Sequence, residues 1–144
     1  LGKRFQRRVE PSAAVLYELG LLHNQLGQLG EAMDHYNQAI DLDPHHAAAR
    51  YDRGELLLEK GAVDDARADF EAAAQLRPDH WAAHYRLAQL AGHRRDSAAL
   101  ETHLMAALRN GFDLKTLLAD PIWREWASDP ELGPPHRRAD CGLW

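Results

Sequence analysis

The feature that most constrains this chain is a repeat with a period of 34 residues. Three blocks align without gaps, and they cover residues 13–46, 47–80 and 81–114. Small residues fill the whole of several alignment columns, among them Gly20, Gly54 and Ala88 in one and Ala39, Ala73 and Ala107 in another. Such columns indicate helices that approach closely, and a period of this length predicts units that stack because none can bury its apolar face alone.

Each of the first two blocks reads as a helix, a turn, a second helix and an exit. Apolar residues follow steps of three and four, as in Leu16, Leu19, Leu22 and Leu26 and then in Ala32, Tyr36, Ala39 and Ile40. Gly27 and Gly61 stand midway, where a glycine can end one helix and begin the turn to the next. Pro44 and Pro78 then close the blocks, because proline cannot continue a helix.

The second and third blocks depart from this regularity. A column of bulky core residues persists through all three blocks as Tyr36, Phe70 and Leu104. However, Arg50 and Arg53 occupy columns that leucine fills in the first block, where their aliphatic stems can still cover apolar surface. Arg95 stands in the mid-turn glycine column, so the third block matches the pattern less closely than the first two.

These residues resemble the tetratricopeptide repeat family. The segments LYELGLLHNQLGQLGEAMDHYNQAIDLDP and YDRGELLLEKGAVDDARADFEAAAQLRP are close to the pattern of that family, and the resemblance covers residue 13 to about residue 114. It implies an all-α fold, a right-handed superhelical array of antiparallel helical hairpins of the α-solenoid type. It also implies a protein that binds other proteins.

The segment after the third block is expected to cap the array. Asp113 can cap a short helix, and Asp120-Pro121 places a cap residue before a proline at the first helical position. The run GFDLKTLLADPIWREWASDPEL looks like the terminal segment of bacterial tetratricopeptide arrays, so residues 115–132 are interpreted as capping helices. Their bulky apolar face would come from Ile122, Trp123 and Trp126.

The two ends of the chain fall outside the repeat. The sequence begins with Leu1 rather than Met, and residues 1–12 read as a basic segment or as the remnant of an earlier helix. In the second case the array would continue upstream. Residues 133–144 show no periodicity and are interpreted as a flexible tail, with docking of Trp144 onto the array or a partner as the alternative.

Composition narrows the range of partners. The chain has 17 basic and 22 acidic residues, and its formal net charge of -5 has the wrong sign for a general nucleic-acid binder. The single cysteine, Cys141, can form neither an internal disulfide nor a cysteine-based metal site. No apolar run approaches the roughly 20 residues that span a bilayer, so a cytoplasmic protein without membrane insertion is expected.

The resemblance also places the candidate binding surface. In such arrays the first helix of each hairpin lines a concave groove. Tyr17, Tyr51 and Tyr85 recur one repeat apart on these helices, and by analogy with the family they face the groove. Tyrosine offers a large rigid contact area and a hydroxyl that can bond peptide carbonyls. The alternative is that these tyrosines pack between adjacent hairpins.

Further candidate contacts on the same first helices surround the tyrosines. They are Glu18, Leu21, Asn24, Asp52, Glu55, Arg86, Gln89 and His93. Acidic residues in the middle of this set would favour a peptide with a cationic centre. Members of the family that hold the carboxylate of a chaperone tail use lysine, asparagine and arginine on these helices. Only Arg86 matches that set here, so a chaperone tail is disfavoured.

The sequence offers no catalytic apparatus, since no nucleophile motif or phosphate-binding glycine loop occurs in it. His80 and His84 are four residues apart, but no third ligand is fixed beside them. We therefore predict no metal and no cofactor, and assign such histidines to loops and helix caps.

Together these features predict a non-enzymatic scaffold or adaptor that binds an extended peptide or a helix in the concave groove. Two alternatives stay open. One is a structural protein that assembles with itself into a homo-oligomer. The other is the regulatory domain of a larger enzyme or signalling protein.

Overall fold

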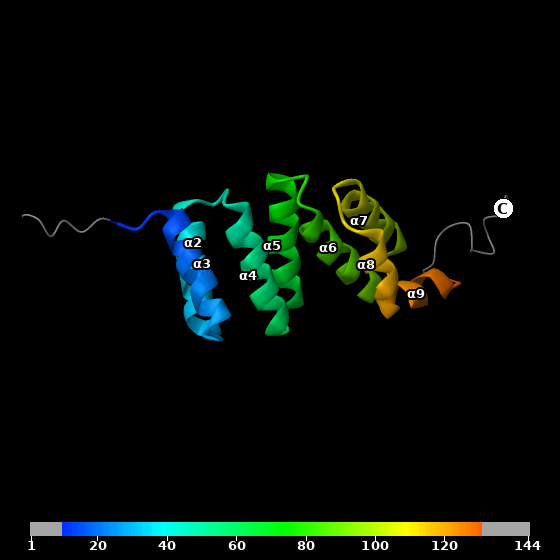
Figure 1. Ribbon diagram of the computed structural model, residues 1–144, viewed down its shortest axis with the longest axis horizontal. Coiled ribbons are helices and arrows are strands. Elements are labelled where there is room, and N and C mark those ends of the chain that lie inside the picture. Colours follow the sequence, from blue (N-terminus) through cyan, green and yellow to red (C-terminus); the bar gives the residue numbers. More distant parts are fainter. Residues whose placement is uncertain (1–9, 131–144) are drawn as a thin grey trace, which may run out of the picture. The chain divides into compact units, whose positions relative to one another are not determined.

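Helices make up all of the regular secondary structure in residues 10–130, which are the residues described by a computed structural model (Figure 1). The helices are α2 (Ala13–Gln25), α3 (Leu29–Leu42), α4 (Ala47–Glu59), α5 (Val63–Leu76), α6 (Trp81–His93), α7 (Ser97–Arg109), α8 (Leu114–Ala119) and α9 (Pro121–Ser128). The predicted all-α fold is thus confirmed for this part of the chain. The predicted tail, residues 133–144 with Cys141 and Trp144, lies outside it, as does most of the predicted N-terminal segment.

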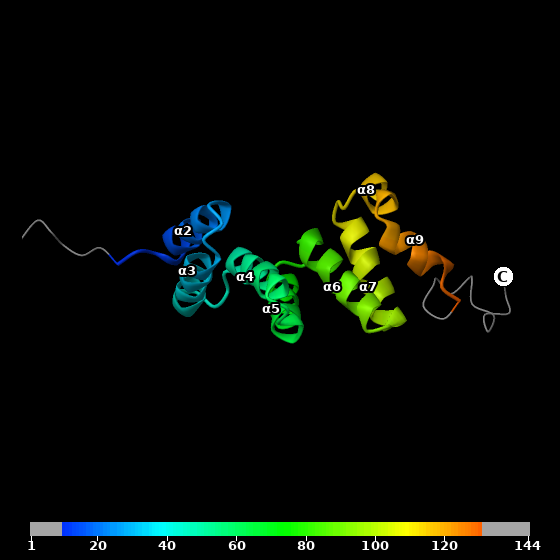
Figure 2. The same cartoon turned by 90° about the horizontal axis from the view of Figure 1, so that it is seen from below.

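The helices fall into two compact units, whose boundary between Ala66 and Arg67 lies within α5. In the first unit, α2 and α3 form an antiparallel hairpin and α4 packs against α3 (Figures 1 and 2). In the second unit, α6 and α7 form the corresponding hairpin, and the short helices α8 and α9 follow it. None of the helices described is both long and apolar enough to cross a bilayer.

Side chains at the helix starts explain where several of these helices begin. The Nδ1 atoms of His46 and His80, one repeat apart, each accept a hydrogen bond of 3.1 Å from a backbone N–H of the first helical turn. The cap role predicted for His80 is therefore confirmed, and His46 has the same role. For His84 the prediction of a loop or cap role is wrong, because this residue lies within α6. Asp113 and Asp120 cap α8 and α9 in the same way, as their positions before those helices predict.

The turns within the hairpins use the left-handed backbone region. Gly27 has a φ of 78° and Gly61 a φ of 81°, which glycine adopts without steric cost. Arg95 holds the corresponding turn of the third hairpin with a φ of 60°. Its guanidinium lies 3.2 Å from Asp129 Oδ2 at the end of α9. The third hairpin thus keeps the turn of the other two at the expense of a strained residue.

Replacing Arg95 by glycine is expected to stabilise the second unit. A left-handed conformation costs an L-residue about 1–2 kcal/mol, whereas the exposed ion pair with Asp129 that the change removes contributes about 0–1 kcal/mol. Urea unfolding measures the difference, and we expect a net gain of about 0.5–1 kcal/mol. Gly61→Ala should lose stability by the opposite argument. A loss of stability in Arg95→Gly would show that the ion pair outweighs the strain.

The core of the first unit is built on Tyr36, whose side chain is fully buried among Ala32, Leu56 and residues of α2. Gly20 of α2 faces this ring so closely that a Cβ atom built on it would lie 2.5 Å from Cδ1 of Tyr36. The close approach predicted from the small column is confirmed at this position.

The two arginines in leucine columns are accommodated at the edge of the core. Both are half-buried. Arg50 Nε donates to the carbonyl oxygen of Pro44 at 3.2 Å, and a guanidinium N–H of Arg53 donates to Asn37 Oδ1 at 3.1 Å. Their charged heads thus find polar partners while the residues stay half-buried, as expected for arginine stems that cover apolar surface.

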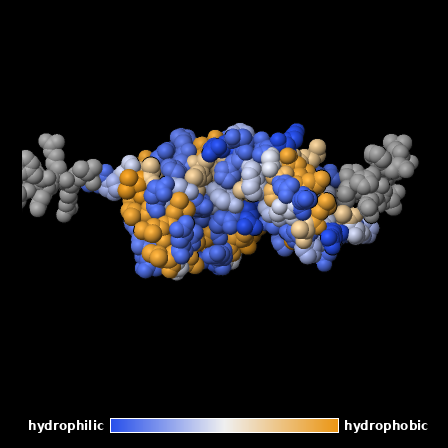
Figure 3. Space-filling view, in the orientation of Figure 1, coloured by the Kyte–Doolittle hydropathy of each residue, from blue (hydrophilic) through white to orange (hydrophobic). Residues whose placement is uncertain are grey.

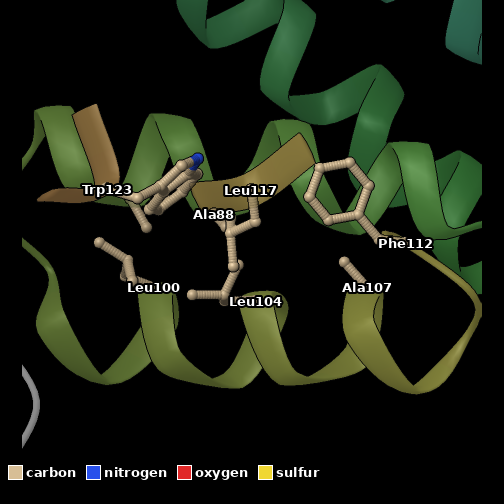
Figure 4. Packing of buried hydrophobic residues seen from close by; sticks show 8 residues of the cluster. Ala88, Leu100, Leu104, Ala107, Phe112, Leu117 and Trp123 are labelled. Atoms are coloured by element: carbon tan, nitrogen blue, oxygen red, sulfur yellow. The ribbon is translucent and has the colours of Figure 1, made fainter. Parts of the chain in front are cut away.

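The core of the second unit joins the α6–α7 hairpin to the helices that follow it. Figure 4 shows Phe112, Leu117 and Trp123 directed toward the apolar face of the hairpin. That face is formed by Ala88, Ala91, Leu100, Leu104 and Ala107. Residues that follow α7 thus pack on the apolar side chains of the α6–α7 hairpin and share its core.

Candidate functional site

In the first unit, the tyrosine of α2 is tied to α4. The hydroxyl of Tyr17 donates to Asp52 Oδ2 at 2.6 Å. The ring centroid of Tyr17 lies 4.9 Å from that of His46 and 6.0 Å from that of Tyr36. The ring of Tyr17 on α2 therefore packs against α3 and the start of α4, and its hydroxyl proton is donated to Asp52.

Burial and the contact with Asp52 keep Tyr17 protonated. Desolvation by burial, followed by the hydrogen bond to Asp52, raises the pKa of Tyr17 well above its usual value of 10.0. A protonated phenol can donate to a carboxylate across the whole physiological pH range, and such charge-assisted hydrogen bonds are among the stronger ones in proteins. The pair thus fixes α2 beside α4.

In the second unit, the tyrosine of α6 is held in a similar way. The hydroxyl of Tyr85 donates to Asp120 Oδ2 at 2.9 Å and accepts a hydrogen bond from the Trp123 indole N–H at 3.2 Å. Its ring lies 4.4 Å from that of Phe112 and 5.6 Å from that of Trp123, measured between centroids. Burial raises the pKa of Tyr85 as well. The hydroxyl of Tyr85 thus acts as both a hydrogen-bond donor and an acceptor.

The two tyrosine–aspartate pairs have the same spacing. Tyr17 and Asp52 are separated by 35 residues, and so are Tyr85 and Asp120. Tyr51 is half-buried on α4, and the residue at the same spacing after it is Arg86 instead of an aspartate. Sequence reasoning assigned Asp52 to the groove and missed Asp120 as the partner of a tyrosine, because the spacing of 35 residues becomes a signal only once the first pair is known.

The other predicted contact residues lie on the same helices as the tyrosines. On α2, Glu18 is exposed, while Leu21 and Asn24 are half-buried. Leu21 also packs against the cluster around Tyr36. On α4, Glu55 is half-buried.

On α6, a guanidinium N–H of Arg86 donates to Gln89 Oε1 at 2.8 Å, and His93 is exposed at the end of the helix. The structure thus brings Arg86 and Gln89 together, next to the tyrosine of the same helix.

The structure adds one feature that the sequence did not point to. A pocket of about 270 Å³ opens in the second unit between α6 and α9. Two predicted contact residues, Gln89 and His93, line it together with the tryptophans of α9, Trp123 and Trp126.

A pair of stacked histidines lies elsewhere in the second unit. The ring centroids of His84 on α6 and His103 on α7 are 6.0 Å apart, and His84 Nε2 is 2.9 Å from the carbonyl oxygen of Pro78. That contact makes Nε2 a donor, which leaves the buried Nδ1 of His84 without a partner. Within residues 10–130, no three histidine, cysteine or acidic side chains are placed to share a metal ion.

His103 is expected to make stability depend on pH. Burial, with His84 and Arg94 adding repulsion, lowers the pKa of His103 below its usual 6.5, against the opposing effect of Glu71 and Asp96. The unfolded chain therefore binds a proton more readily than the folded one. The contribution of His103 is complete above about pH 6.5 and is lost as the pH falls from there toward its lowered pKa.

Thermal unfolding at pH 7.5 and pH 5.5 tests this expectation. The drop in Tm on acidification should be smaller in His103→Gln than in the unchanged chain, while His45→Gln, at an exposed position of the first unit, should leave the drop as it is. An unchanged drop in His103→Gln would contradict the assignment.

Two family models match the chain. One, described as "TPR repeat", matches residues 20–61, and the other, described as "Tetratricopeptide repeat", matches residues 51–111. Together they extend over more than half of the sequence. The chain belongs to the tetratricopeptide repeat family, and the resemblance noted in the sequence is confirmed.

Two solved structures share the fold. MamA is 21% identical with a TM-score of 0.63, and the match covers 75% of this chain and 61% of that one. YrrB, described as a TPR protein with an unusual peptide-binding site, is 23% identical with a TM-score of 0.64, and the match covers 76% of this chain and 57% of that one. These likenesses confirm the α-solenoid class, an array of helical hairpins.

A curated protein matches over a shorter stretch. It is the probable biofilm formation methyltransferase WspC of Pseudomonas aeruginosa, 54% identical over 39 residues. The match covers 27% of this chain and only 9% of that protein. The likeness is thus confined to a small part of a much longer protein.

Proposed function

We propose that this chain is a non-enzymatic protein-interaction scaffold that binds an extended peptide or a helix along the first helices of its hairpins. Membership of the tetratricopeptide repeat family supports an interaction role, and the peptide-binding site reported for YrrB supports a peptide as the ligand. The observation that carries the proposal is the pair of tyrosine–aspartate hydrogen bonds.

These hydrogen bonds would prepare the binding surface. By tying α2 to α4, and α6 to the start of α9, they hold neighbouring side chains in place before a partner arrives. Preorganisation of this kind improves affinity because less conformational freedom is lost on binding. In this proposal Tyr17, Tyr85 and Asp52 position the surface, and partner contacts come from Glu18, Leu21, Asn24, Tyr51, Glu55, Arg86, Gln89 and His93.

Introducing or reversing a charge on the first helices tests the proposal. Asn24→Glu, Glu55→Arg and His93→Glu, in an affinity-tagged chain, should each weaken capture of the physiological partner by about tenfold or more if the partner contacts them. The matched controls Glu31→Arg and Thr102→Glu alter exposed residues of the second helices α3 and α7. Helical circular dichroism should be unchanged in all five. Equal weakening by the controls would place the binding surface elsewhere.

Self-assembly is a second candidate, favoured by apolar surface on the first unit. Val15, Leu22 and Leu26 of α2 are exposed by 49%, 50% and 62%. Figure 3 shows hydrophobic residues gathered over the α2–α3 hairpin on the face turned toward the viewer. Light scattering over a range of concentrations decides between the candidates, because a constant monomeric mass contradicts self-assembly.

The likeness to WspC favours a further candidate, the regulatory domain of a larger enzyme or signalling protein. In that protein the matching stretch is a small part of the whole. An antibody raised against the repeats would then detect a native polypeptide much larger than 144 residues. Detection of a polypeptide of this length alone contradicts the candidate.

A further inference from the structure

The pocket between α6 and α9 has an apolar floor and a polar rim. Its floor is formed by Ala88, Leu100, Ile122, Trp123 and Trp126. Its rim carries Gln89 and His93 of α6, Glu125 of α9, and the ion pair between Arg95 and Asp129. All of these residues belong to the second unit, so the pocket is complete within it.

The size of the pocket limits what it can hold. Sites for drug-sized ligands and cofactors measure about 300–1,000 Å³, and this pocket of about 270 Å³ lies just below that range. Two of the residues that line it, Trp123 and Trp126, are aromatic. These properties fit one bulky apolar side chain that enters from a chain lying across the mouth.

We infer that the pocket is an anchor site for a peptide that presents a phenylalanine or leucine side chain followed directly by a lysine or arginine. The inference rests on the proposed scaffold function and assigns its partner a chemical class. The apolar side chain is buried against the indoles of Trp123 and Trp126, and the cation lies over the rim beside Glu125.

The charges on the rim select the neighbouring cation. The guanidinium of Arg95 lies 3.2 Å from Asp129 Oδ2, so much of the charge of that carboxylate is compensated within the chain. Glu125 is exposed on α9 and adds a second negative charge to the rim. A lysine or arginine beside the anchor can pair with Glu125 and also contact the face of an indole.

The tryptophan of the floor offers a further reason for a peptide ligand. The indole Nε1 of Trp126 is buried and finds no acceptor among the described residues. An unmatched buried donor is costly, so the indole of Trp126 can turn toward a peptide carbonyl at small expense once a ligand occupies the pocket. The pocket therefore matches a peptide in two respects, with an apolar surface for one side chain and a negative charge for a neighbouring cation.

Titration of the ¹⁵N-labelled chain with short peptides tests the inference. The probe is acetylated and amidated Gly-Ser-Phe-Lys-Gly, compared with versions in which Phe is replaced by Ala or Lys by Glu. The Phe-Lys peptide should shift the indole N–H signals of Trp123 and Trp126 and the amide of Gly92 in a saturable way. The Ala version should bind at least about tenfold more weakly and the Glu version about threefold more weakly.

Variants of the chain separate the pocket from other surfaces. Gln89→Trp fills the mouth and should abolish these shifts, whereas Gln25→Trp, the same change at the exposed end of α2, should not affect them. Glu125→Lys, on the exposed side of α9, should reverse the preference between the Lys and Glu peptides. This charge swap tests the site even if Gln89→Trp disturbs the fold.

Three results overturn the inference. They are equal binding of the Phe and Ala peptides, unchanged preference in Glu125→Lys, and absence of saturable shifts at the pocket. Shifts confined to α2 and α4 would reject the pocket while supporting the scaffold function. If no signal shifts at all, the pocket is rejected, and the capture experiment with the charge variants still decides the scaffold function.

Discussion

Replacing Trp123 by alanine is expected to destabilise the second unit by about 3–5 kcal/mol, the usual loss for removing a large aromatic side chain from a core. Trp123 is only 6% exposed and belongs to the buried cluster that also contains Leu100 of α7 and Leu117 of α8 (Figure 4). Its indole N–H also donates to Tyr85. The change therefore removes both packing and a partner of the tyrosine–aspartate pair.

Urea unfolding followed by circular dichroism measures this loss. Trp126→Ala is the matched control, because Trp126 lies on the same helix and is only half-buried. It should cost clearly less than Trp123→Ala. If the two variants lose equal stability, or if Trp123→Ala unfolds at the urea concentration of the unchanged chain, then α9 does not cover the hairpin as described.

Replacing Gly20 by alanine is expected to destabilise the first unit by about 1–3 kcal/mol, the usual cost of overpacking a core. The added Cβ would clash with Cδ1 and Cε1 of Tyr36. Because the ring of Tyr36 is fully buried, it cannot move away without displacing its own neighbours.

Gly30→Ala provides the matched control for this change. Gly30 lies within α3, and a Cβ built on it meets nothing within 4 Å. Alanine is the better helix former, so this variant should gain about 0.5–1 kcal/mol in unfolding free energy. We therefore expect the free energy of unfolding to fall in Gly20→Ala and to rise in Gly30→Ala. Gains in both would mean that α2 and α3 are less closely packed than the structure has them.

Periodicity predicted the hairpins and their core because both depend on local steps along the chain. Columns of small and bulky residues at a spacing of 34 locate the close contacts, as Gly20 against Tyr36 illustrates. Glycines midway through the blocks predicted the turns, since only the left-handed region closes them without strain. Helix caps are also local, because a cap side chain bonds to a backbone N–H only a few residues further along the chain. His46, His80 and Asp120 are examples.

The partners of the tyrosines could not be read from the same pattern. Which hydroxyl meets which carboxylate depends on how one hairpin element packs on the next, and the repeat columns do not determine this. Tyr85 is satisfied by two residues from the segment after the last repeat, Asp120 and Trp123. Likewise, the pocket arises where α9 leaves α6 partly uncovered, which depends on the three-dimensional shape of the unit.

Site-specific photo-crosslinking to the physiological partner tests the central claim most directly. A benzophenone amino acid placed at Leu21, Glu55 or His93 would probe the first helices, and one at Glu31, Glu71 or Thr102 would probe the exposed surface of the second helices. If the chain is a scaffold that binds along its first helices, the partner should crosslink from the first set and not from the second. Crosslinks from the second set alone would contradict the account.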